Sequence, residues 1–198
     1  MQRMGNRSAN ALKQELVVRV EATSRATTEA VYAVLADLGS HTVWAGERQK
    51  KRTRLLTIDA RPGPAVVGTE FHSTGSDPMG TFSDRSVVTE ATAGKAFEFV
   101  TQARLTTKKG IATDWTNVER YELEPTVGGC RIVSTSRVTR ISEMPGMLGV
   151  FNVRGLRRLG LAVSAKVSRR SVQNLARVAE ERSEFVAGEA TKGQERAK

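Results

Sequence analysis

The chain has 198 residues, of which 39% are hydrophobic and 26% are charged, and these proportions are those of one globular domain with a sizeable core. Its single cysteine, Cys130, excludes an internal disulfide and cannot form a zinc site alone, as expected in a reducing compartment. The formal net charge of +10 raises the question of nucleic acid, but no helix-turn-helix or zinc-finger spacing accompanies it. No apolar run approaches the roughly 20 residues of a membrane span, and residues 1–15 lack the apolar centre of a secretion signal, so we expect a cytoplasmic location.

The N-terminal part predicts a strand followed by two short helices. Residues 1–14 are polar and aperiodic, which indicates a disordered leader. Residues 15–22 alternate between apolar and polar side chains, as a half-buried strand does. Thr27 and Thr28 precede Glu29 and spaced apolar residues, so a capped helix is expected from Thr27 to about Leu38, with Gly39 ending it. A second helical turn is expected at residues 41–44.

From Arg54 the apolar period changes from about 3.6 to about 2 residues and stays there to Ile141. Short turns rich in Gly, Pro, Asp and Lys divide this stretch into strands. The expected strands are residues 54–60, 68–76, 82–89, 96–104, 111–124 and 130–141. Consecutive strands joined by short turns form an antiparallel meander, so the chain is predicted to be an α+β domain.

Residues 148–186 predict one long amphipathic helix, and residues 188–198 a disordered charged tail. The apolar side of that helix carries Leu156, Val163, Val167, Leu175, Val178 and Phe185. The middle of this stripe holds the small residues Gly160, Ser164 and Ser171. These small groups either let the helix approach the sheet closely or leave a gap that a ligand fills.

The opposite side of the helix is basic and has no aromatic residue. It carries Arg158, Lys166, Arg169, Arg170, Gln173, Arg177 and Glu180. We interpret this side as a solvated face, with contact to an anionic membrane or to RNA as the alternative.

Several segments in this order resemble one known family. The first strand runs into Thr27-Thr28-Glu29-Ala30-Val31 and the helix that ends near Asp37, with Trp44 behind it. Gly68-Thr69-Glu70-Phe71 follows on a later strand, and Tyr121-Glu122-Leu123-Glu124-Pro125 leads to Gly128-Gly129-Cys130-Arg131-Ile132. With the long last helix, residues 15–187 are similar to the START-like, or SRPBCC, superfamily of polyketide cyclase/dehydrase and lipid-transport proteins.

The resemblance implies a helix-grip fold, in which about seven curved antiparallel strands wrap around the C-terminal helix. It also implies an elongated apolar cavity between sheet and helix that binds hydrophobic or amphipathic molecules. Only some members of such families are enzymes, so fold alone does not identify a reaction.

The strand at residues 111–124 is the richest in candidate site residues. If Tyr121 faces inward, a period of two also turns Glu119, Asn117 and Trp115 inward. Burial would raise the pKa of Glu119 and suit it to general acid or base catalysis. The alternatives are opposite parity or an ion pair with an arginine such as Arg85. The candidate catalytic residues are therefore Glu119, Tyr121 and Arg85.

The predicted ligand-binding residues come from four strands and the last helix. They are Phe71, Phe97, Phe99, Trp115, Asn117, Glu119, Tyr121, Ser164, Val167 and Ser171.

Other reactive residue types are given structural roles. His72 should point to solvent because its neighbour Phe71 points inward, His41 should have a capping or loop role, and Cys130 should be a packed thiol. No second histidine or carboxylate stands at metal-ligand spacing to either histidine, so neither metal nor cofactor is predicted. The apolar junction at residues 144–151 either borders the cavity mouth or closes the core.

Three functions follow as hypotheses. The first is binding of a lipid, a polyketide or another hydrophobic molecule by a monomer or homodimer. The alternative is a cyclase or dehydratase acting on a polyketide-like substrate without a metal. A further alternative is an interaction protein that uses the basic helix face on anionic membrane or RNA.

Overall fold

The computed structural model describes residues 15–49, 54–141 and 154–196, and their side chains except those of residues 154–156 and 187–196. The seven strands form one antiparallel sheet in the order β1-β7-β6-β5-β4-β3-β2. The strands are β1 (Leu16–Ser24), β2 (Arg54–Ala60), β3 (Glu70–Ser76), β4 (Gly80–Thr92), β5 (Ala96–Thr107), β6 (Ala112–Thr126) and β7 (Gly129–Ile141). The predicted apolar junction at 144–151 lies outside the described residues.

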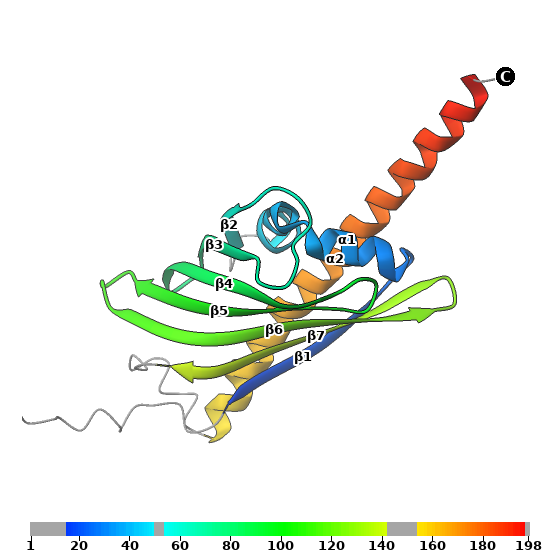
Figure 1. Cartoon of the computed structure of the whole chain (residues 1–198). Coiled ribbons are helices and arrows are strands. Elements are labelled where there is room, and N and C mark those ends of the chain that lie inside the picture. The colour runs from blue at the N-terminus through cyan, green and yellow to red at the C-terminus, as the bar shows by residue number, and fades with distance from the viewer. Residues whose placement is uncertain (1–14, 50–53, 142–153, 197–198) are drawn as a thin grey trace, which may run out of the picture.

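The sheet is an open, bent meander, and this confirms the predicted α+β helix-grip class. Register shifts interrupt the pairing of β2 with β3, of β4 with β5 and of β6 with β7. Such bulges bend a strand locally. Figure 1 shows the long strands β4 to β7 curving along their length, with α2 (Arg154–Arg196) crossing one face of the sheet. The concave face and the helix therefore enclose the interior of the domain.

The segment after β1 folds as predicted at its start and departs from the prediction at its end. Helix α1 (Thr28–Ala36) begins after Thr27, whose hydroxyl accepts a hydrogen bond from the Ala30 amide at 3.2 Å. The helix stops at Ala36 rather than Leu38 because the chain tightens there into a 3₁₀ turn, η1 (Leu38–Ser40). Two further short turns, η2 (Thr42–Gly46) and η3 (Glu47–Gln49), carry the chain toward β2.

Among the residues whose side chains the structure describes, helix α2 is most deeply buried along its middle. Val172, Leu175, Ala176, Val178 and Ala179 are buried there. Leu175 and Val178 thus lie inside as predicted.

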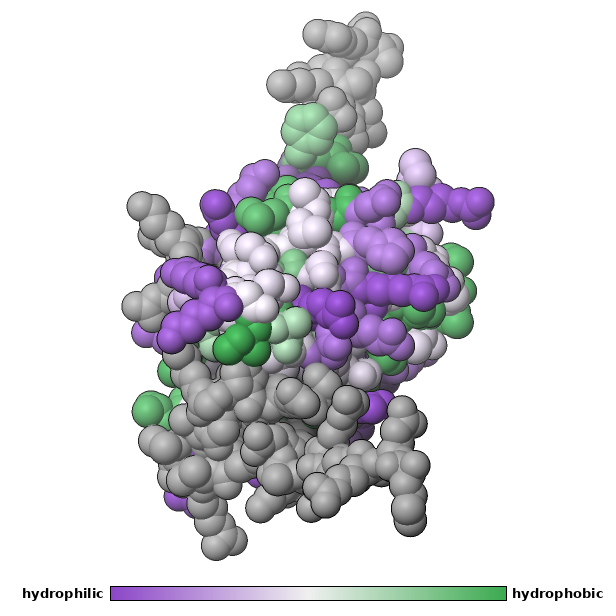
Figure 2. All heavy atoms as spheres, turned by 90° about the vertical axis from the view of Figure 1, so that its left-hand side faces the viewer, coloured by the Kyte–Doolittle hydropathy of each residue, from purple (hydrophilic) through white to green (hydrophobic). Residues whose placement is uncertain are grey.

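Two other residues of the predicted apolar stripe are exposed. Val163 is 55% exposed and Phe185 66% exposed, so their predicted burial is wrong. Phe185 lies toward the C-terminal part of the helix, which leaves the domain (Figure 1), whereas Val163 lies nearer the start of the helix on a side that is open to solvent. Figure 2 shows apolar surface where the projecting helix begins. The backbone stays helical to Arg196, whereas the sequence suggested a frayed tail from Gly188.

The core lies between the sheet, α1 and the middle of α2. Its fully enclosed side chains include Val31 and Leu35 of α1, Phe97 of β5, Ile132 of β7 and Leu175 of α2. Each element therefore contributes the face that its apolar period predicts. None of the helices in the described part of the chain has an apolar stretch that could cross a bilayer.

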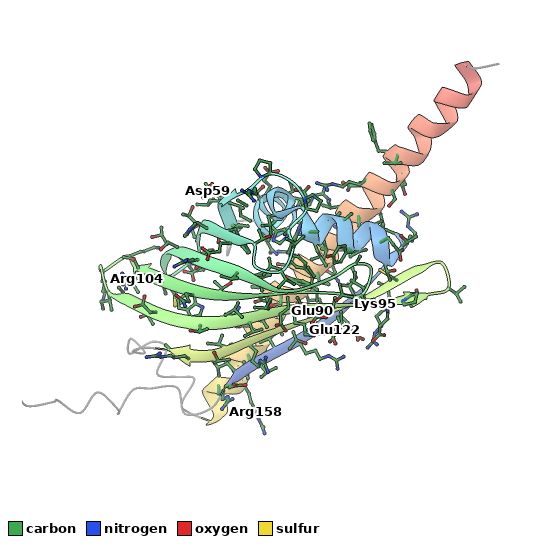
Figure 3. All side chains as sticks on the ribbon, viewed as in Figure 1. Asp59, Glu90, Lys95, Arg104, Glu122 and Arg158 are labelled. Carbon is green, nitrogen blue, oxygen red and sulfur yellow. The ribbon has the colours of Figure 1, made fainter. Side chains whose placement is uncertain are left out.

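Charged residues cover the outer face of the sheet. The Arg120 guanidinium pairs with the carboxylates of Glu90 and Glu98, and Arg104 binds Asp114 through two hydrogen bonds of 2.7 and 2.9 Å. Figure 3 shows Glu90 and Glu122 on this side of the sheet. These ion pairs all lie on the outer face, so they do not involve the side chains of the inner face.

Candidate functional site

A pocket of about 340 Å³ lies between the concave face of the sheet and α2. Strands β2 to β7 form its floor and sides, residues of η2 form one wall, and α2 covers it. The residues that α2 contributes are Val167, Ser168, Ser171 and Val172. Of the small residues predicted in the stripe, Ser171 borders this space, whereas Gly160 and Ser164 do not line it.

Hydrogen bonds between α2 and the η2–η3 segment hold this wall of the pocket in place. The buried Asn174 donates from Nδ2 to the backbone oxygens of Trp44, at 3.1 Å, and of Arg48, at 3.2 Å. The buried Gln49 amide donates to the Ser171 hydroxyl. Wall and cover are therefore held together at one end of the pocket, independently of any ligand.

Aromatic rings supply most of the large apolar groups in the pocket. Phe71 and Phe99 meet edge to face with centroids 5.4 Å apart, and Trp44 meets Tyr121 in the same way at 6.1 Å. Trp115 lies on the same strand as Tyr121 and also lines the pocket. Such rings give a ligand a large contact area with little loss of side-chain entropy.

Most of the predicted ligand-binding residues are brought together by the fold. Those that line the pocket are Phe71, Phe99, Trp115, Asn117, Glu119, Tyr121, Val167 and Ser171. The parity predicted for residues 115–121 is the one observed, because β6 keeps a period of two through this stretch.

Three predicted residues lie elsewhere. Phe97 is fully enclosed in the core and packs edge to face on Tyr32 at 6.2 Å, because α1 covers that end of β5. Ser164 is half-buried on α2 but does not line the pocket. Arg85 points outward and pairs with Glu70 at 2.9 Å, since its neighbours on β4 point inward. The suggested ion pair between Arg85 and Glu119 is therefore absent.

Glu119 is held by an amide rather than by a cation. Its Oε1 accepts a hydrogen bond of 2.7 Å from the Asn117 amide, which in turn accepts one of 3.3 Å from the Ser136 hydroxyl. Burial raises the pKa of Glu119, and the hydrogen bonds from Ser136 and Asn117 oppose that change. Burial and the nearby Glu119 also raise the pKa of the Tyr121 hydroxyl. Glu119 can therefore hold a proton more readily than a surface carboxylate does.

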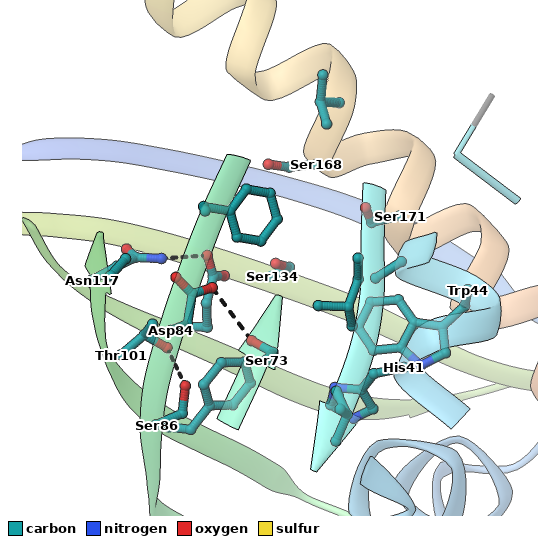
Figure 4. Close-up of a pocket in the computed structure, with 18 of the residues that line it drawn as sticks. His41, Trp44, Ser73, Asp84, Ser86, Thr101, Asn117, Ser134, Ser168 and Ser171 are labelled. Atoms are coloured by element: carbon teal, nitrogen blue, oxygen red, sulfur yellow. Dashed lines mark hydrogen bonds between the residues drawn. The ribbon is translucent and has the colours of Figure 1, made fainter. Parts of the chain in front are cut away.

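A second carboxylate, Asp84 of β4, enters the same pocket. Its Oδ2 accepts a hydrogen bond of 3.4 Å from the Ser73 hydroxyl, while its buried Oδ1 has no hydrogen-bond partner among the described residues. Burial raises the pKa of Asp84 from 3.8 to about 6. Figure 4 shows this bond and the bond from Asn117 within one pocket. Asp84 was missed in the sequence, although it shares the parity of the buried Ser86 and Val88.

His41 and Trp44 form the wall at η2. The His41 ring is buried 4.7 Å from the Trp44 ring, and its Nε2 lies 2.8 Å from the Leu35 carbonyl oxygen, to which it donates. Burial lowers the pKa of His41 to about 4, so the ring is neutral at neutral pH. The Trp44 Nε1 is buried and finds no hydrogen-bond partner among the described residues. His41 thus lines the pocket and also donates to a carbonyl in the last turn of α1, and His72 is exposed as expected.

Comparison with known proteins identifies the fold and no family. No protein-family model matches the chain, and no curated protein matches it. Among solved structures, an uncharacterised protein from Rhizobium leguminosarum matches with a TM-score of 0.60 and 12% identity, over 86% of this chain and 98% of that one. The KanY protein, solved in solution, matches with a TM-score of 0.52 and 14% identity, over 84% of this chain and 99% of that one.

A further match comes from a biosynthetic locus. DynU16, a protein of the dynemicin biosynthetic locus, has a TM-score of 0.50 and 15% identity, over 83% of this chain and 47% of that one. At such low identity these likenesses establish the arrangement of sheet and C-terminal helix alone.

Proposed function

We propose that this protein binds a hydrophobic or amphipathic small molecule, such as a lipid or a polyketide-like compound, in the pocket beneath α2. The observation that carries the proposal is the pocket itself: about 340 Å³ of space lined by aromatic and aliphatic side chains together with hydroxyl, amide and carboxylate groups. Ligand pockets commonly measure roughly 300 to 1,000 Å³ and combine apolar walls with a small number of polar groups that orient the ligand. The rings supply contact area, and Asn117, Ser134 and the two carboxylates supply orientation.

Filling the pocket from the helix side tests this proposal. Ser168 lines the pocket, so Ser168→Leu should place its larger side chain in the space that a ligand would occupy. We expect the affinity for a neutral apolar dye such as Nile red to fall at least about tenfold, while the unfolding free energy changes by less than about 1 kcal/mol.

Ser164→Leu is the matched control, because it makes the same change on the same helix outside the pocket lining. It should leave dye affinity unchanged. Equal dye affinity in the wild type and in Ser168→Leu would contradict the proposal, as would a severe loss of stability in Ser168→Leu, since that loss would mean that the helix packs closely on the sheet there.

An enzyme on the same pocket is the second candidate, favoured by the environment of Glu119. Because burial raises the pKa of Glu119, its carboxylate is a stronger base than a surface carboxylate and can take a proton from a carbon between two carbonyls of a polyketide-like chain. The same group can return that proton to the alkoxide oxygen that forms when the carbon attacks a ketone of the chain. It can then take the second proton of that carbon and give it to the new hydroxyl, which leaves as water as the carbon–carbon double bond forms, so each of the two protons is accounted for. Tyr121, beside Glu119 on β6, offers a hydroxyl that can hydrogen-bond the developing enolate oxygen.

Glu119→Gln separates the two candidates. If the protein is an enzyme of this kind, the variant should lose turnover of a synthetic poly-β-ketone by at least about a hundredfold. It should also still bind Nile red. Unchanged turnover in Glu119→Gln would remove Glu119 from the reaction.

A further inference from the structure

We infer that the pocket selects an organic ammonium ion, a cationic nitrogen attached to an apolar or aromatic body, over an anionic ligand of the same shape. The inference rests on the proposed function, because it presupposes that the pocket takes a small molecule. The groups that line the pocket indicate this class of ligand.

The pocket is acidic although the protein is basic. Asp84, Glu119 and Asp77 line it, and its lining contains no Lys or Arg among the described residues. Its histidine, His41, is buried and already donates to a backbone carbonyl. The described Lys and Arg residues that make the protein basic therefore lie outside the pocket lining.

The three carboxylates differ in what they already bind. Asp77 accepts hydrogen bonds at Oδ1 from the amides of Met79, at 2.7 Å, and of Gly80, at 2.9 Å, so its role is to shape the turn before β4. Glu119 accepts a hydrogen bond from the Asn117 amide. Asp84 receives one long hydrogen bond, at Oδ2, and its other oxygen is buried without a partner in the described part of the chain.

The unpartnered Oδ1 of Asp84 indicates which chemical group a ligand should bring to the pocket. A buried carboxylate is costly unless a donor or a counter-charge reaches it. An ammonium group supplies both at once, and hydrogen bonds between charged groups are about twice as strong as neutral ones. An anionic head would instead meet two carboxylates in a region of low dielectric constant without a compensating cation.

The aromatic walls favour the same ligand. The faces of Trp and Tyr rings attract cations, with Trp the strongest. Trp44, Trp115 and Tyr121 line the pocket together with the acidic side chains. Trp44 also holds a buried indole N–H with no partner among the described residues, which can donate to a neutral part of the ligand. Rings and carboxylates together therefore fit a cationic nitrogen on an apolar body.

A matched series of probes tests the inference. Naphthylmethylamine, naphthylmethanol and naphthoate share one ring system and differ in charge, and each can be titrated into the full chain by calorimetry at about pH 7.5, where an ordinary amine is protonated. We expect the amine to bind at least about tenfold more tightly than the alcohol, and naphthoate to bind more weakly than either.

Two variants locate the effect. Asp84→Asn removes the charge with little change of shape, so the amine should lose about tenfold in affinity while the alcohol keeps its own. Glu119→Gln should reduce the amine's advantage in the same direction. Glu70→Gln, on the outer face of the neighbouring strand, is the matched control and should change none of the three affinities.

The outcomes distinguish this inference from the proposed function. If the three probes bind equally, or naphthoate binds most tightly, the inference is wrong and the pocket remains a binding site. If the amine's advantage survives in both Asp84→Asn and Glu119→Gln, the carboxylates do not select it and the inference is likewise wrong. If no probe binds and Nile red does not bind either, the proposed function fails and the inference fails with it.

Discussion

Replacing Asp84 by asparagine should stabilise the protein at neutral pH and not at acidic pH. Burial raises the pKa of Asp84 from 3.8 to about 6, so the folded protein holds this proton more tightly than the unfolded chain does. The raised pKa of Asp84 contributes stabilisation of the folded state that is fully present below about pH 4 and is lost as the pH rises through about 6.

The expected size of the effect follows from that shift. One pKa unit corresponds to 1.36 kcal/mol, so a shift of about two units is worth roughly 3 kcal/mol, or about 2 kcal/mol once partial access of solvent is allowed for. Asparagine does not ionise and keeps the shape of the side chain. The unfolding free energy of the variant relative to that of the wild type should therefore be about 2 kcal/mol higher at about pH 7.5 than at about pH 4.

Urea denaturation of both proteins at the two pH values measures this difference, and subtracting variant from wild type cancels the other titrating groups. Asp114→Asn is the matched control, because Arg104 lowers the pKa of that aspartate on the outer face of the sheet. Its effect should have the opposite sign and be smaller. A stability difference for Asp84→Asn that does not change with pH would refute the reasoning.

Two further predictions concern backbone and helix packing. Gly129→Ala should lose more than about 2 kcal/mol of unfolding free energy, because a Cβ at this position would overlap the Ser24 backbone. Gly128→Ala, whose φ is 84° but whose Cβ would meet open space, should lose only about 1 kcal/mol; equal losses in urea denaturation would contradict this contrast. Leu175→Ala should cost about 2 to 5 kcal/mol of unfolding free energy because Leu175 is fully buried. Val163→Ala should cost less than about 1 kcal/mol because Val163 is exposed on α2. A lower melting temperature for Val163→Ala than for Leu175→Ala would contradict this account of how α2 packs.

The strands and their inward faces could be predicted because their physical signal is local. A period of two sets the face of each side chain on β6, and Trp115, Asn117, Glu119 and Tyr121 follow it. The period of α2 likewise gave one apolar stripe. Whether that stripe is buried depends on where the sheet and α1 lie, and this is why Val163 and Phe185 were misplaced.

The polar part of the pocket could not be predicted in full. Asp84 shares the parity of Val88 on β4, but the polar residues around it make the local alternation weak, so its inward side chain was missed. His41 enters the pocket because η2 folds back under α2, held by Asn174, and such a contact across more than a hundred residues leaves no local pattern. The Ser136 hydroxyl that bonds Asn117, the partner of Glu119, lies on β7, so this part of the hydrogen-bond network depends on the pairing of β6 with β7.

The most direct test of ligand binding beneath α2 uses the two tryptophans of the chain, Trp44 and Trp115, because both line the pocket. In a nitrogen-15 NMR titration with naphthylmethanol, both indole N–H signals should shift, saturate together and give one dissociation constant. With the Ser168→Leu variant, both signals should move far less at the same probe concentrations. Saturable binding of the probe that leaves both indole signals of the wild type unchanged would place the ligand elsewhere and contradict a binding site between the sheet and α2.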